Sequence, residues 1–188
     1  MSDEDPSVTV AARRLVAENS RWRVYLDRVV DRGGAEVPDY LAVEPKVALA
    51  GGITGVCVLP VLADGRVVLV ENYRHLFRRS GWEVARGFVE PGESEEAAAL
   101  REMAEEAGVV ADSAERIGAF TPEPSTLRAR GAIFIARNCR PGGTRDASEI
   151  GLGRAQAFAR NEIERMLDAG AIEDAATLIA LLWWLKRG

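Results

Sequence analysis

The segment from Gly87 to Val109 constrains the fold of this chain more than any other stretch of the sequence. A Pro91–Gly92 turn leads to Ser94, which is a typical helix N-cap, and Gly108 can adopt the left-handed conformation that ends a helix. The sequence therefore predicts a short helix in which an apolar face packs against the protein. Three carboxylates are expected to project from the opposite face: Glu102, Glu105 and Glu106.

Carboxylates crowded on one short helix repel one another unless a cation or an arginine neutralises them. Arg101 lies four residues before Glu105 and can pair with it. Oxygen ligands favour a hard ion, Mg²⁺ or Mn²⁺, over zinc. Glu102 and Glu106, one turn apart, are the best candidate ligands; Glu105 is a ligand or a base. Glu93 is a supporting ligand or the partner of Arg101. A solvated acidic helix face is the alternative, but it would not require Glu93 or the flanking glycines.

The same segment resembles the Nudix box, G-x5-E-x7-R-E-U-x-E-E-x-G-U with U a bulky apolar residue, and every fixed position is met. The resemblance implies an α+β fold, an α/β/α sandwich with a mixed central sheet between helices. It also implies metal-dependent hydrolysis of the diphosphate bond in a nucleoside diphosphate linked to another group. In that family the backbone carbonyl just before the box glycine reaches the metal, and Arg86 offers it here.

The flanking residues resemble the ADP-ribose pyrophosphatase branch of that family. The branch typically shows Gln-Tyr-Arg and then Trp-Glu-Leu-Pro-Ala-Gly before the box. Here the chain has Asn72-Tyr73-Arg74 and then Trp82-Glu83-Val84-Ala85-Arg86-Gly87. Pro124 falls where the branch keeps a marker proline, although Ser125 follows it in place of the usual glycine. The resemblance implies hydrolysis of ADP-ribose to AMP and ribose 5-phosphate.

Two alternatives remain open. If the large side chain of Arg86 reshapes the pocket, the substrate is another nucleotide sugar, NADH or a dinucleoside polyphosphate. A non-catalytic nucleotide-sugar sensor is the alternative from a different class, and the intact box glutamates argue against it.

Residues outside the box are also candidates for the site. The resemblance implies that a loop glutamate orients or deprotonates the attacking water, and Glu149, with Asp146 in reserve, is in the right region. A solvated loop acid is the alternative for each. Glu83 is also a candidate for the outer coordination shell of the metal. Candidate substrate contacts are Arg74, Glu83, Arg86, Trp22 and Pro124. The competing interpretation for the arginines is a solvated basic surface, and for Trp22 it is a role in the core.

Hydrophobic periodicity places the remaining elements. Strands are expected at Val8–Val10, Trp22–Val30, Val37–Val43, Ile53–Leu62 and Arg66–Tyr73, around Ile117 and at Ala132–Ala136. A Gly-rich loop is expected at Cys139–Glu149. Helices are expected at Phe158–Ala169 and Ala175–Lys186. Residues 1–48 are predicted to form a small antiparallel β element for dimerisation and the substrate pocket, and residues 49–188 the Nudix domain.

Composition limits the partners. The chain of 188 residues carries a net charge of −5, so a small-molecule nucleotide, and not a nucleic acid, is the expected partner. Cys57 and Cys139 lack metal-ligand or disulfide spacing, which favours a cytoplasmic protein. The longest apolar run, Leu178–Leu185, is too short to span a bilayer, so no membrane partner is expected. The resemblance and the β element together imply a homodimer.

Overall fold

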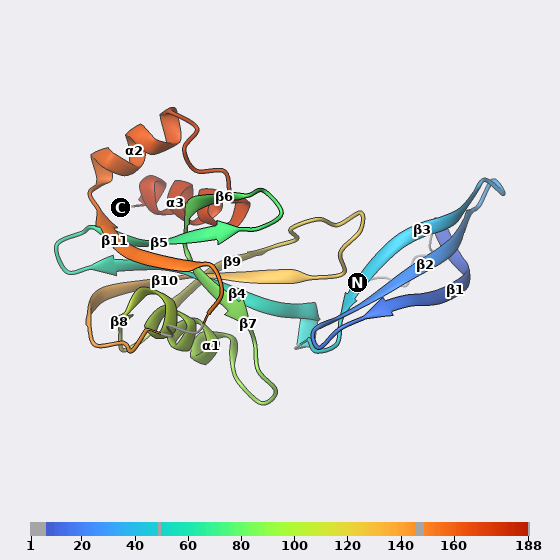
Figure 1. The fold of residues 1–188 in the computed structure, drawn as a ribbon, viewed down its shortest axis with the longest axis horizontal. Coiled ribbons are helices and arrows are strands. Elements are labelled where there is room, and N and C mark those ends of the chain that lie inside the picture. Colours follow the sequence, from blue (N-terminus) through green and yellow to red (C-terminus); the bar gives the residue numbers. More distant parts are fainter. Residues whose placement is uncertain (1–6, 49, 146–148, 188) are drawn as a thin grey trace. The chain divides into compact units, whose positions relative to one another are not determined.

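The computed structural model describes residues 7–48, 50–145 and 149–187 (Figure 1). The chain divides into two compact units. Unit 1 comprises residues 1–48 together with 123–129, and unit 2 comprises residues 49–122 and 130–188.

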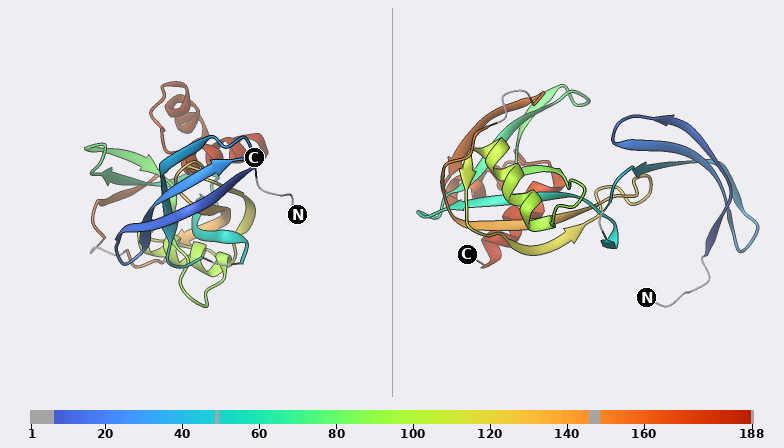
Figure 2. Two further views of the ribbon diagram at one scale, coloured as in Figure 1. Left: turned by 90° about the vertical axis from the view of Figure 1, so that its right-hand side faces the viewer. Right: turned by 90° about the horizontal axis from the view of Figure 1, so that it is seen from below.

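Unit 1 is built on a three-stranded antiparallel sheet in the order β1-β2-β3, whose strands are long and strongly twisted (Figure 2). The strands are β1 (Val8–Glu18), β2 (Trp22–Asp31) and β3 (Glu36–Pro45). The segment 123–129 adds to the outer edge of β3, because Val43 N donates to Thr126 O at 2.8 Å and Arg128 N donates to Val43 O at 2.8 Å. This short parallel pairing gives the edge of β3 backbone partners that it would otherwise lack.

Unit 2 contains an eight-stranded mixed sheet. Its strands are β4 (Ile53–Leu62), β5 (Val67–Arg74), β6 (Arg79–Glu83), β7 (Ala85–Phe88), β8 (Val109–Val110), β9 (Glu115–Phe120), β10 (Arg130–Pro141) and β11 (Leu152–Phe158). The order is β11-β5-β4-β10-β8, with β6 on β5, β7 on β4 and β9 on β10. The pairing of β4 with β10 is parallel, whereas the other pairings in this sheet are antiparallel.

Helices cover both faces of this sheet (Figure 1). They are α1 (Glu95–Glu102), the π-helical turn η2 (Met103–Ala107), α2 (Arg160–Asp168) and α3 (Ala175–Arg187); a short 3₁₀ turn, η1 (Ala50–Gly52), precedes β4. Strand β4 is apolar from Val56 to Leu62, as suits a strand that is buried on both sides. Val56 and Val58 pack with α1 and η2, whereas Cys57 and Leu59 pack with α2 and α3. The expected α/β/α sandwich with a mixed central sheet, and the separate small antiparallel sheet, are confirmed.

The expected strands at Trp22–Val30, Val37–Val43, Ile53–Leu62 and Arg66–Tyr73 are confirmed with small shifts in their ends, and so is the last helix. Three boundaries were wrong. Strand β1 continues past Val10 into the charged residues that were expected to form a link. Arg13 can lie in the strand because its guanidinium donates to the buried carboxylate of Asp27 on β2, at 2.9 and 2.7 Å.

The other two wrong boundaries concern the last third of the chain. The loop expected from Cys139 begins later, because β10 continues to Pro141 and pairs there with β8. The helix expected from Phe158 begins at Arg160, because Phe158 is the last residue of β11 and lies opposite Val67.

A buried threonine ties α3 to the sheet, and its removal should destabilise the fold. Thr177 is fully buried; its hydroxyl accepts from Val84 N at 3.0 Å and donates to Asp174 Oδ2 at 2.6 Å. Thr177→Val leaves the Val84 N–H without its partner, and we expect the free energy of unfolding to fall by about 1–3 kcal/mol in urea denaturation. Thr9→Val, at an exposed hydroxyl, is the control. Equal stability of both variants would contradict this role.

Candidate active site

The helix predicted from the glycine-flanked glutamate segment forms as α1 followed by η2. Ser94 Oγ accepts from Ala97 N at 3.1 Å and so caps the start of α1, and Gly108 has a φ of 69° at the end of η2. Both capping predictions are confirmed. The change from α-helix to π-helix at Met103 was not expected; π-turns often occur at functional sites because they re-aim side chains.

The three glutamates do not all project outward as expected, because two of the three carboxylates are buried. Only 8% of Glu102 and 2% of Glu106 is accessible to solvent, because β7 packs directly against them. A Cβ atom at Gly87 would overlap with the Glu102 carboxylate, so a larger residue there would displace that carboxylate. The neighbouring Arg86 N donates to Glu106 Oε2 at 2.8 Å. Of the three glutamates only Glu105 keeps substantial access to water.

Burial changes the acidity of these carboxylates. Removal from water raises the pKa of Glu106 to about 8, and the negative charges of Glu149 and Glu102 act in the same direction. Burial also raises the pKa of Glu102, although the Arg101 hydrogen bond opposes the shift. Two buried carboxylates with raised pKa values and a third one nearby form a site that a bound cation would stabilise.

Arg101 organises the start of this site. Its guanidinium donates from Nε and Nη2 to the two carboxylate oxygens of Glu93, both at 3.0 Å, and from Nη2 to Phe88 O at 3.0 Å. Nη1 donates to Glu102 Oε1 at 2.8 Å and to Glu105 Oε2 at 3.1 Å. Because of the bidentate pair, the pKa of Glu93 is held below its usual value. Arg101 therefore links the loop before the helix to its glutamates.

These residues fit a hard divalent cation. Among the described residues, no three His, Cys, Asp or Glu side chains are placed so that they could together hold a metal ion. The donor set is nevertheless all oxygen, and Glu106 faces a backbone amide with no cationic side chain bonded to its carboxylate in the described contacts. The Glu102 carboxylate lies against Gly87, the residue that follows Arg86. Carboxylate and backbone oxygen donors of this kind suit Mg²⁺ or Mn²⁺.

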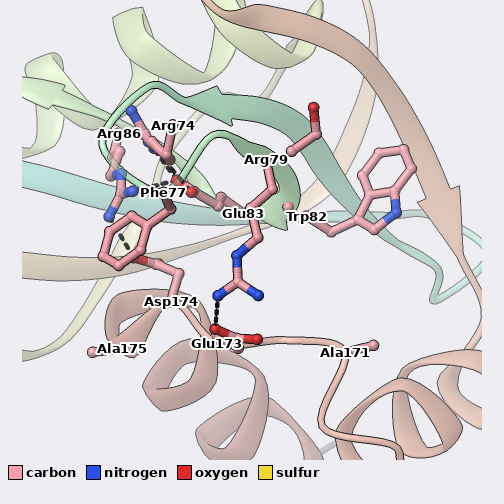
Figure 3. A pocket seen from close by; sticks show the side chains of 12 residues that line it. Arg74, Phe77, Arg79, Trp82, Glu83, Arg86, Ala171, Glu173, Asp174 and Ala175 are labelled. Atoms are coloured by element: carbon pink, nitrogen blue, oxygen red, sulfur yellow. Dashed lines mark hydrogen bonds and ion pairs between the residues drawn. The ribbon is translucent and has the colours of Figure 1, made fainter.

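A pocket of about 370 Å³ lies beside the side chain of Arg86 (Figure 3). The guanidinium of Arg86 is bonded to Glu83 and, at 2.7 Å, to Asp174 at the start of α3. Glu83 is buried and also accepts from Arg74, with Nε at 2.9 Å from Oε1. Although burial opposes it, the positive charge of Arg86 holds the pKa of Asp174 below its usual value. Arg86 thus contacts the glutamate helix through its backbone and the pocket through its side chain.

Aromatic side chains and a further ion pair complete the lining of the pocket. Arg79 pairs with Glu173, and Phe77 and Trp82 supply apolar surface (Figure 3). Glu173 and Asp174 were not among the predicted site residues. The sequence did hold a signal for Asp174, because an Asp directly before an apolar helical run is a typical N-cap, and Asp174 Oδ2 does accept from Thr177 N at 2.9 Å.

The remaining candidates lie elsewhere in the chain. Glu149 is exposed just before β11, near enough for its charge to raise the pKa values of Glu102 and Glu106. Asp146 lies outside the described residues. Trp22, at the start of β2, and Pro124 belong to unit 1, whereas the other candidates belong to unit 2.

The fold is shared with a solved structure. The chain resembles the crystal structure of an ADP compounds hydrolase with a TM-score of 0.79 over 98% of this chain and 97% of that one, at 20% sequence identity. Residues 53–178 match the model of the NUDIX domain family. This chain therefore belongs to the NUDIX domain family, and the family resemblance of its sequence is confirmed.

Relatives within the family share a name. Over 119 residues the chain is 29% identical to the ADP-ribose pyrophosphatase of Bacillus subtilis (strain 168), covering 62% of this chain and 63% of the relative. It is also 29% identical over 128 residues to the ADP-ribose pyrophosphatase of Escherichia coli (strain K12), covering 62% and 60%. The chain thus matches about three-fifths of the length of each. Among the described residues, no helix is long and apolar enough to cross a membrane.

The raised pKa of Glu106 predicts how the stability of the metal-free protein depends on pH. A carboxyl whose pKa rises on folding, here from 4.5 to about 8, stabilises the fold below the lower value and loses that contribution as pH rises through the higher one. In EDTA, the free energy of unfolding of the wild type should therefore fall relative to Glu106→Gln between about pH 5 and about pH 8, by a few kcal/mol. Glu105→Gln, at the more exposed position, is the control. Parallel stability curves for the wild type and Glu106→Gln would contradict the assignment.

Proposed function

We propose that this protein hydrolyses the diphosphate bond of a nucleoside diphosphate linked to another group, with ADP-ribose as substrate and AMP and ribose 5-phosphate as products. The observation that carries the proposal is the pair of buried carboxylates, Glu102 and Glu106, held against the backbone of Arg86 and Gly87. Membership of the NUDIX domain family and the two relatives named ADP-ribose pyrophosphatase support the choice of substrate.

The reaction is proposed to depend on Mg²⁺ or Mn²⁺. Glu102, Glu106 and the Arg86 carbonyl would hold the ion, with Glu105 as a further ligand and Glu93 as a support through Arg101. When bound, the ion would neutralise charge on the diphosphate and lower the pKa of water near phosphorus. It would also relieve the repulsion between carboxylates that burial has desolvated.

The side chains of the protein supply the other parts of the reaction. Glu149 is proposed to orient the attacking water and accept its proton. The water oxygen forms a new bond to phosphorus as the bridging P–O bond breaks, and the leaving phosphate keeps the electron pair. Arg101 fixes Glu102 and Glu105 in place during this step. Glu105 is the alternative base, because its carboxylate keeps access to water.

The pocket beside Arg86 is proposed to receive part of the substrate. Arg74 and Arg86 offer guanidinium groups, and Glu83, which bonds both, fixes their orientation. Arg86 fills space where the branch keeps a small residue, so it is proposed to limit which group fits there. Trp22 and Pro124 remain proposed substrate contacts from unit 1.

A cytoplasmic homodimer is also proposed. Unit 1 carries solvent-exposed apolar side chains in its sheet: Val8, Val10, Leu15, Val16, Val37, Tyr40 and Leu41. An isolated small sheet gains stability by covering such side chains. Both cysteines are free and buried, in keeping with a reducing compartment. A monomeric mass in light scattering would contradict the dimer.

A substrate panel tests the proposed function. Purified protein with Mg²⁺ or Mn²⁺ is incubated with ADP-ribose, other nucleotide sugars, NADH and dinucleoside polyphosphates, and products are separated by chromatography. We expect ADP-ribose to be cleaved fastest, and Glu106→Gln to reduce the rate at least 100-fold because it removes a proposed ligand. Glu95→Gln, whose carboxylate pairs with Arg116, is the control on the same helix. No cleavage of any compound would overturn the function; preference for another compound would overturn only the substrate.

A further inference from the structure

Arg145 occupies a position that no family motif explains. It lies in the segment 142–145 after β10, and its side chain reaches two separate elements. Its Nε donates to Glu106 O at 2.6 Å, and its Nη2 donates to Gly153 O. One guanidinium therefore bonds the last turn of the glutamate helix and the beginning of β11.

The segment before Arg145 packs tightly on the same helix end. Gly142 N and Gly143 N both donate to Gly108 O, at 3.4 and 3.3 Å. A Cβ atom at Gly143 would lie only 2.8 Å from Ala104 Cα, so a larger residue would push the segment away. The two glycines thus allow the backbone to approach η2 closely enough for Arg145 to reach the carbonyl of Glu106.

The bond to Glu106 O suits the end of a helix. The last carbonyls of a helix lack partners within it and carry the negative end of its dipole, so an arginine there satisfies both. Because Arg86 N holds the Glu106 carboxylate, this residue is fixed at its side chain and at its backbone. Arg145 is itself exposed, so its loss should affect the global stability only slightly.

The bond from Arg145 to Gly153 O links Arg145 to the segment that carries Glu149. Glu149 lies between Arg145 and Gly153 in the sequence, so the two ends of its segment are joined through one guanidinium to the backbone of Glu106. We propose that Arg145 is a positioning residue, a clamp that sets the distance between Glu149 and the glutamate helix. The inference rests on the proposed hydrolase function, because it assigns Arg145 an effect on the proton transfer at Glu149.

A double-mutant cycle on ADP-ribose hydrolysis tests the clamp. Arg145→Ala should lower kcat about 10-fold or more with little change in KM, because substrate contacts are retained. Glu149→Gln should lower kcat about 100-fold in the wild type, in the range of a lost general base, and by much less in the Arg145→Ala background. Arg140→Ala, which removes a surface ion pair with Asp112 at the end of β10, should leave the Glu149→Gln effect intact. Fold-changes that simply multiply would overturn the positioning role.

Hydrogen exchange separates failure of the clamp from failure of the function. Arg145→Ala should speed amide exchange at the end of η2 and at the start of β11, and leave exchange in β4 unchanged. Arg140→Ala should change exchange in none of these three places. Unchanged exchange in an active Arg145→Ala enzyme overturns the clamp alone. If the wild type cleaves nothing on the panel, the proposed function fails, and with it the positioning role of Arg145 in the reaction, whatever the exchange shows. Full recovery of kcat in Arg145→Met, which cannot donate, would also overturn the proposal.

Discussion

The packing of strand β7 against the glutamate helix is the contact on which the site depends. Gly87 leaves room for the Glu102 carboxylate, and the amide of Arg86 donates to Glu106 at 2.8 Å. This contact desolvates two acids that would otherwise face water, which raises their pKa values. Arg101 pairs with Glu102, but among the described contacts no cationic side chain bonds the Glu106 carboxylate. Burying a carboxylate without a counter-charge carries a large cost of desolvation, and the proposed divalent cation would offset it.

The same strand joins two regions that lie on opposite faces of the sheet. The backbone of Arg86 bonds the helix on one face, and its side chain pairs with Glu83 and Asp174 beside α3 on the other face. Since α1 and η2 pack on one core and α3 on the other, β7 carries the connection across the sheet. The proposed reaction site at the helix and the proposed substrate pocket therefore share one residue, Arg86, where the ADP-ribose branch typically has a small residue.

The sequence predicted the elements and the acidic cluster better than the environment of each residue. Spacing located the helix, its Ser94 cap and its Gly108 stop, but periodicity relates side chains only to their own helix, so it could not reveal that β7 covers Glu106. Contacts between distant residues were likewise hidden. Arg86 meets Asp174 88 positions away, and Arg145 reaches back 39 positions to the carbonyl of Glu106, and neither pairing leaves a local pattern.

Proton release on metal binding would show whether Glu106 ionises when it holds the proposed ion. If Glu106 is protonated in the free protein near neutral pH and ionised when it holds the ion, Mn²⁺ binding at pH 7 should release about one proton. Titration calorimetry in buffers of different ionisation enthalpy measures this number. We expect proton release in the wild type, and in Glu106→Gln both the loss of that release and much weaker binding. Equal affinity in the variant, or binding without proton release, would show that Glu106 is not a protonated acid that ionises to hold the ion.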